Sequence, residues 1–172
     1  MAAIGIADWL TPARVIPQIR EADKCELVDA LAMHLAADSG LSKEALVAAA
    51  AVTADLPPLM LRGGVSLFHT VAAGLTRPIA VFARLRKPLS LGGFGDCDTD
   101  LVAFLVSPAD TRGDHLRALA CLARRLRRTD VLAHLRATKC RDVMYLILTS
   151  DEWRASQVKM PSSSNASRHF RI

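Results

Sequence analysis

The chain has 172 residues, of which 51% are hydrophobic and 23% are charged, and its formal net charge is +5. This length is typical of one domain, and this hydrophobic content excludes a wholly disordered chain. The positive charge is concentrated in residues 112–136 and in the segment from Arg154 onward, and the remainder is mildly acidic. A basic nucleic-acid-binding face over the whole protein is therefore not expected.

The first part of the chain predicts a short strand followed by a helix. The strand covers Arg14–Ile19, and Pro17 places it at an edge or an end of a sheet, because proline cannot donate a ladder hydrogen bond. The helix covers Asp23–Asp38, with Asp23 as its N-cap and Gly40 as its stop.

The middle of the chain predicts a second helix and then strands. The helix covers Ser42–Ala51 and is capped by its own first residue. Gly63 and Gly64 predict a turn that leads into a strand ending at His69. Two further strands, joined as a hairpin by a glycine turn at Gly92–Asp96, are predicted at Pro78–Leu85 and Leu101–Val106. The last of these is apolar throughout, which indicates a strand buried on both faces.

The last part of the folded region predicts three helices, at Asp114–Arg127, Thr129–Thr138 and Cys140–Thr149. The first of them has an apolar stripe that we expect to face the core, made of Leu116, Leu119, Ala120, Ala123 and Leu126. The whole pattern predicts an α/β fold, a three-layer α/β/α sandwich with helices on both faces of a small sheet.

Residues 1–153 are predicted to form a single domain, and residues 154–172 a basic, serine-rich, disordered tail. The four cysteines include no C-x-x-C pair, and neither a metal site nor a cofactor is expected. The start lacks the features of a secretory signal, and no run approaches 18 apolar residues. We therefore expect a cytoplasmic protein without a membrane span.

Two histidines are the candidates for chemistry. His69 follows a strand, and His115 lies at the start of a helix that comes just after a buried strand. Strand ends and helix N-termini meet at one edge of an α/β sheet, where ligands collect. A neutral imidazole is a competent nucleophile near pH 7, and helix N-terminal N–H groups favour a nearby anion. The pair is a candidate site for phosphoryl transfer to histidine, although a histidine at a strand end is more often structural.

The sequence resembles the fructose/mannitol-type IIA domains of the bacterial phosphoenolpyruvate phosphotransferase system, and among them the nitrogen-regulatory IIA proteins. The similarity extends from about Trp9 to Trp153. The family's G-x-A-x-P-H-G stretch corresponds to Gly64–Thr70, and its V-D-L-x-F-x-L-x-x-P segment is matched by Asp100–Pro108. Its H-L-x-x-L helix corresponds to the segment that begins with His115 and Leu116.

The resemblance implies a IIA fold with a small mixed sheet and no metal. It implies that His69 accepts a phosphoryl group from an HPr-like phosphocarrier and that His115 assists by hydrogen bonding. Gly64, Ser66 and Arg62 are the implied phosphate-binding residues, with Arg62 standing in for a family arginine whose place falls at about Thr53. The sequence carries no IIB segment. This favours a regulatory role, in which the phosphorylation state controls binding to target proteins that the sequence does not name. A homodimer is left open.

Two other functions are compatible with the same sequence. The family's proline before the active histidine is Phe68 here and the following glycine is Thr70, so the alternative is a divergent regulatory module that binds partners without being phosphorylated. A nucleic-acid-binding domain is a weaker third reading, because no base-reading motif accompanies the basic segment. Arg117, Arg124 and Arg128 share one helical stripe, which is either a solvated face or a docking patch for an acidic partner.

Overall fold

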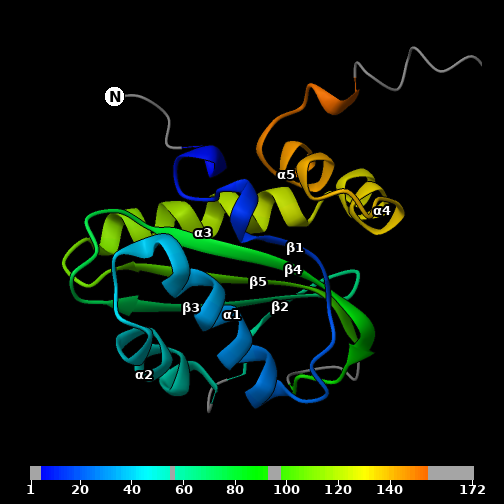
Figure 1. Ribbon diagram of the computed structural model, residues 1–172. Helices are drawn as coiled ribbons and strands as arrows, with labels where there is room; N and C mark the ends of the chain where they lie inside the picture. Colours follow the sequence, from blue (N-terminus) through cyan, green and yellow to red (C-terminus); the bar gives the residue numbers. More distant parts are fainter. Residues whose placement is uncertain (1–4, 55–56, 93–97, 155–172) are drawn as a thin grey trace, which may run out of the picture.

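The computed structural model describes residues 5–54, 57–92 and 98–154. Its elements, drawn in Figure 1, are two short 3-10 helices, five strands and five α-helices in the described residues. In chain order they are η1 (Ile6–Asp8), η2 (Pro12–Arg14), β1 (Val15–Ile19), α1 (Lys24–Ser39), α2 (Lys43–Ala54), β2 (Leu59–Leu61), β3 (Val65–Ala72), β4 (Ile79–Leu89), β5 (Thr99–Pro108), α3 (Arg112–Leu126), α4 (Thr129–Ala137) and α5 (Arg141–Thr149).

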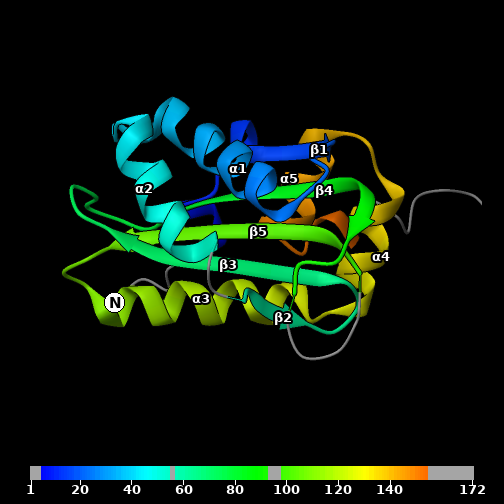
Figure 2. The same cartoon turned by 90° about the horizontal axis from the view of Figure 1, so that it is seen from below.

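The strands form one mixed sheet in the order β1-β4-β5-β3-β2. β4 and β5 pair antiparallel, as the predicted hairpin requires, while β1 pairs with β4 and β3 pairs with β5 in parallel. Helices α1 and α2 cover one face of the sheet, and α3, α4 and α5 lie on the other (Figures 1 and 2). This arrangement confirms the predicted α/β sandwich with a small mixed sheet.

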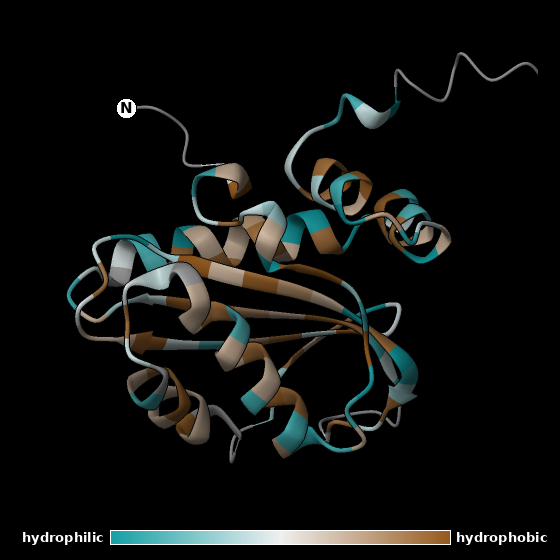
Figure 3. Ribbon diagram, in the orientation of Figure 1, coloured by the Kyte–Doolittle hydropathy of each residue, from teal (hydrophilic) through white to brown (hydrophobic). Residues whose placement is uncertain are grey.

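Two apolar clusters, one on each face of the sheet, form the core. Leu101–Val106 of β5 is fully buried, and alternate residues of this run enter the two clusters. Figure 3 shows apolar residues along the central strands, as expected for a sheet covered on both faces. β1 is an edge strand, as Pro17 predicts, and its register with β4 shifts between Ile16 and Ile19.

The helix caps follow the predicted chemistry. The Asp23 carboxylate accepts a hydrogen bond of 2.9 Å from the backbone N–H of Glu26, and α1 ends at Gly40 with φ 75°. The Ser42 hydroxyl accepts from the N–H of Ala45 at 3.1 Å at the start of α2. Each cap satisfies a backbone group that the helix itself leaves without a partner.

Three predictions about local structure differ from what is observed or fall outside it. β3 does not end at His69: it continues to Ala72, because its parallel pairing with β5 extends to Pro108. The buried side of α3 is also different, since Leu116 and Ala120 are exposed while Ala118 and Leu122 are buried. The predicted turn at Gly92–Asp96 and the predicted disordered tail lie almost wholly outside the described residues, so the domain boundary stays a prediction.

A tight turn joins β2 to β3, and its geometry depends on glycine. Gly63 and Gly64 have φ values of 83° and 75°, in the left-handed region. The Gly64 carbonyl accepts from the N–H groups of Asp100 and Leu101, at 3.0 and 3.2 Å. Arg136 of α4 clamps the turn by donating to the Gly63 carbonyl and to both carboxylate oxygens of Asp100. These contacts raise the pKa of Arg136, because the carboxylate stabilises its charged form.

We expect Gly64→Ala to lower the free energy of unfolding by about 2 kcal/mol, because it strains a left-handed residue and crowds its neighbours. The added Cβ would lie 3.0 Å from Asp100 Oδ1 and 3.2 Å from the Asp98 carbonyl oxygen. Gly113→Ala is the matched control: it lies in α3 with no atom within 4 Å of the new Cβ, and it should be neutral or slightly stabilising. Urea unfolding of both variants measures the difference; equal stabilities would contradict this account of the turn.

Candidate active site

The two predicted histidines meet above the sheet on the side of α3. His69 lies on β3 and His115 lies in the first turn of α3. Nδ1 of His69 is 3.3 Å from Nε2 of His115, and the ring centroids are 5.2 Å apart with a tilt of 48°. His69 is exposed and His115 is half-buried, so the pair lies at the surface with one imidazole accessible from solvent.

A third side chain completes a hydrogen-bonded series. Ser107, which is fully buried near the end of β5, has its hydroxyl oxygen 3.0 Å from Nδ1 of His115. The series runs from Ser107 Oγ through the His115 ring to Nδ1 of His69. Among the described residues, Nε2 of His69 has no hydrogen-bond partner. That nitrogen is therefore the one available to a reactant.

Ser107 was not among the residues predicted from sequence. Its signal was present but weak: it is the polar residue between the apolar run Leu101–Val106 and Pro108, eight positions before His115. A serine at a strand end is usually a turn residue, and only the packing of α3 against β5 brings its hydroxyl to an imidazole.

The surroundings of both imidazoles favour the neutral form of the ring. Partial removal of water lowers the pKa of His69 below its ordinary value of 6.5, because the charged imidazolium loses more solvation than the neutral ring. The pKa of His115 is lowered by the same desolvation and, secondarily, by repulsion from a charged His69. At pH 7 both rings are therefore mainly neutral and carry one proton each.

The three predicted phosphate-binding residues lie away from the histidines. Ser66 is fully buried, and its hydroxyl is 2.6 Å from Thr99 Oγ1 and also bonds to Met60. Gly64 is in the β2–β3 turn, about 16 Å from His69 at 3.3 Å per strand residue, and Arg62 is exposed in the same turn. The structure thus brings His69 and His115 together but places the other three toward the opposite end of β3. Their binding of phosphate stays a prediction, without support from this arrangement.

Phe68 does not obstruct the histidine that follows it. Successive side chains of a strand point to opposite faces, and Phe68 is fully buried in the cluster under α1 and α2. His69, one residue later, points to the face covered by α3. The large aromatic residue is therefore a core residue and leaves the His69 ring accessible.

Among the residues whose side chains the structure describes, which do not include Arg112, no Lys or Arg forms a hydrogen bond or ion pair with either histidine ring. The described chain also holds no cluster of three or more His, Cys, Asp or Glu side chains suited to a metal ion. Within the described ranges, no helix combines the length and apolar character needed to cross a membrane. The described side chains that meet at this site are two imidazoles and a hydroxyl.

Titration should reveal the coupling between the rings. We expect both histidines to titrate below 6.5, and the pKa of His115 to rise in His69→Ala, since that change removes a like charge and part of the desolvation. The measurement is NMR titration of the ring protons in the wild-type chain and in His69→Ala. A His115 pKa that does not move in His69→Ala would show that the two rings do not interact in solution.

Residues 9–150 match the family described as "Phosphoenolpyruvate-dependent sugar phosphotransferase system, EIIA 2". A "Nitrogen regulatory protein" from Bradyrhizobium diazoefficiens is 29% identical over 143 residues, which are 83% of this chain and 94% of that protein. The fold is similar to that of nitrogen regulatory protein IIA-Ntr from Neisseria meningitidis, with a TM-score of 0.77, 22% identity, and coverage of 84% of this chain and 99% of that one.

IIA mannitol from Escherichia coli has the same fold, with a TM-score of 0.68, 18% identity, and coverage of 81% of this chain and 98% of that one. Identities this low support the fold alone, whereas the family match spans most of the sequence. The chain therefore belongs to the EIIA 2 family of the phosphoenolpyruvate-dependent sugar phosphotransferase system.

Proposed function

We propose that this chain is a cytoplasmic regulatory phosphoprotein that accepts a phosphoryl group on Nε2 of His69 from an HPr-like phosphocarrier. The observation that carries the proposal is the series Ser107–His115–His69, which engages Nδ1 of His69 and leaves Nε2 open. The regulatory role is supported by the relative named as a nitrogen regulatory protein.

The hydrogen bonds can set which nitrogen of His69 is the nucleophile. If Nδ1 of His69 carries its proton, that N–H donates to Nε2 of His115, and Nε2 of His69 keeps an in-plane lone pair. His115 must then carry its own proton on Nδ1 and donate to Ser107 Oγ. The reverse arrangement would put the proton of His69 on Nε2 and remove the lone pair. Phosphoryl acceptance on Nε2 therefore requires Ser107 to act as an acceptor.

Transfer itself needs no proton to move. As the bond between phosphorus and the nitrogen of the carrier's histidine breaks, a bond forms between phosphorus and Nε2 of His69, and Nδ1 keeps its proton. The arriving phosphoryl group is anionic and raises the pKa of nearby imidazoles. This favours a second proton on Nε2 of His115, which then no longer accepts from Nδ1–H of His69 and donates instead to a phosphoryl oxygen. The first turn of α3 adds N–H groups and the positive end of a helix dipole nearby.

The partner in the proposal is a phosphorylated protein. A solved complex from Escherichia coli joins enzyme IIA mannitol, whose fold this chain shares with a TM-score of 0.67, to phosphorylated enzyme IIB mannitol. For this chain we propose the HPr-like carrier as the donor, because the exposed face of His69 is open to a protein surface that presents a phosphohistidine.

A second candidate is a regulatory module that keeps the fold and binds partners without being phosphorylated. It is favoured by the sequence, in which the place of the family arginine falls at about Thr53, and no cation whose side chain the structure describes forms a hydrogen bond with the histidine pair. A dianionic phosphoryl group would then depend on His115 and backbone N–H donors, without the bidentate pairing that a guanidinium offers.

Phosphorylation from phosphoenolpyruvate, with enzyme I and an HPr-like carrier, distinguishes the two candidates. We expect one acid-labile, alkali-stable phosphate on the wild-type chain and none on His69→Ala. His115→Ala should keep the acceptor but slow the transfer by about tenfold or more, because a hydrogen bond to a charged group is lost. An unphosphorylated wild-type chain beside a demonstrably charged carrier would favour the binding module.

Ser107→Ala should slow phosphoryl transfer about three- to tenfold, the effect of losing one hydrogen bond that selects a tautomer. Ser66→Ala is the matched control, because Ser66 is an equally buried serine of the same sheet whose hydroxyl bonds to Thr99 and Met60. The 15N shifts of His115 should also change in Ser107→Ala and not in Ser66→Ala. Equal rates and equal shifts in the two variants would exclude the positioning role of Ser107.

A further inference from the structure

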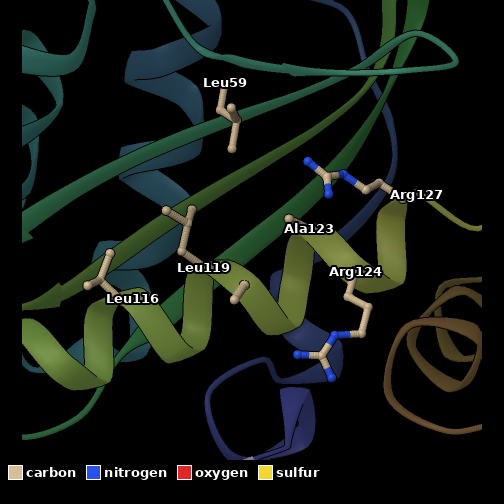
Figure 4. Close-up of a pocket in the computed structure, with 7 residues that line it drawn as sticks. Leu59, Leu116, Leu119, Ala123, Arg124 and Arg127 are labelled. Carbon is tan, nitrogen blue, oxygen red and sulfur yellow. The ribbon is translucent and has the colours of Figure 1, made fainter.

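An apolar groove lies between α3 and the edge strand β2. It is lined by Leu59, Leu116, Leu119, Ala120 and Ala123, and Arg124 and Arg127 border it toward the C-terminal end of α3. Figure 4 shows the α3 leucines on the side of the helix that faces Leu59. Leu59 is 38% exposed and Leu116 is 63% exposed, so solvent reaches the apolar groups.

This groove contains most of the stripe that the sequence pattern assigned to the core. Toward the rest of the protein, α3 buries Ala118 and Leu122 together with the last two residues of the predicted stripe, Ala123 and Leu126. The helix therefore has apolar residues on two sides, and only one side is covered by the described chain. Single exposed leucines are common in proteins, but a contiguous apolar strip in a groove is typical of an interaction site.

The two arginines at the groove, Arg124 and Arg127, differ from neighbouring arginines that have acidic partners. Arg117 pairs with Asp114 at 3.6 Å, and Arg128 pairs with Asp130 at 2.9 Å and Asp151 at 3.1 Å. Within the described ranges, the side chains of Arg124 and Arg127 form no ion pair or hydrogen bond. Figure 4 shows Arg127 extending toward the strands and Arg124 extending from the other side of α3. Two cations without internal partners thus flank one end of the apolar strip, and a complementary ligand would carry acidic groups on its two flanks.

We propose that this groove binds an acidic amphipathic helix of a partner protein. Leu116, Leu119, Ala120 and Ala123 follow the i, i+3, i+4, i+7 spacing, which forms a ridge that packs against a second helix. The distance from Leu116 to Arg127 along α3 is about 16 Å, or three helical turns. Apolar side chains of the partner helix would fill the groove, and its carboxylates would pair with Arg124 and Arg127.

Other occupants agree less well with these residues. The groove volume of about 490 Å³ is large enough for a small molecule, but its lining lacks the converging polar groups that orient one. Residues 155–172 contain Lys159, Arg168 and Arg171 and no Asp or Glu, so the arginines would repel them. A flat anionic bilayer would reach the rim arginines without filling the concave strip.

The proposal goes beyond phosphoryl transfer and does not require it. The groove begins one residue after His115, yet none of its lining residues forms a hydrogen bond with the imidazoles in the described structure. A chain that fails to become phosphorylated would still bind the helix. For the same reason, His69→Ala should leave helix binding unchanged, which separates a failure of this proposal from a failure of the proposed function.

The test uses the full chain and a labelled synthetic helix of about four turns, with leucines on one face and glutamates on both flanks. A second peptide replaces every glutamate by lysine. We expect the acidic peptide to shift NMR signals of Leu59, Leu116 and Leu119, and to bind about tenfold tighter than the lysine peptide. Leu116→Glu should weaken binding at least about tenfold, whereas Val52→Glu, at an equally exposed position on α2, should not.

Reversing the charges of Arg124 and Arg127 is the most discriminating experiment. The double variant Arg124→Glu/Arg127→Glu should bind the lysine peptide better than the acidic one, while Arg86→Glu/Lys87→Glu, at exposed residues of β4, should keep the wild-type preference. Equal binding of both peptides, shifts mapped elsewhere, or no shift at about 1 mM acidic peptide would overturn the proposal. The proposal would also be overturned if the NMR signals of the groove residues changed with anionic vesicles, with chain concentration or on removal of residues 155–172, and did not change with the peptide.

Discussion

The parallel pairing of β3 with β5 is the constraint on which the histidine pair depends. Its register places His69 opposite Leu105, two residues before Ser107. The chain leaves β5 at Pro108 and enters α3 at Arg112, so His115 returns over the strands it has just left. A buried serine, a helix residue and a strand residue thus come together, although 46 positions separate the two histidines. No flexible loop carries any of the three groups, which favours a fixed geometry.

Much of the fold could be predicted because its signals are local. Asp23 and Ser42 set helix starts through side-chain hydrogen bonds to the backbone, and Gly40 ends α1 in the left-handed region. The apolar run Leu101–Val106 is typical of a strand buried on both faces. The approach of His69 to His115 was also expected, because strand ends and helix N-termini meet at one sheet edge.

The remaining features depend on packing that no local pattern contains. The end of β3 is set by how far β5 continues beside it, and so the prediction that β3 ends at His69 was wrong. α3 has two apolar sides, and hydrophobic periodicity cannot tell which one the sheet covers. Ser107 becomes significant only when α3 lies over β5, and Ser66, three residues before His69, points into the other half of the core.

The alternation of side chains along β3 also limits how this site can evolve. Phe68 and His69 are neighbours in sequence, yet one fills the core under α1 and α2 and the other lies beside α3. Moving the imidazole by one position would place it in the core and place the phenyl ring at the surface. A reactive histidine can therefore migrate along this strand only in steps of two residues. The same rule makes a one-residue deletion between the glycine turn and His69 more damaging than most substitutions, because it would destroy half of the core and the site together.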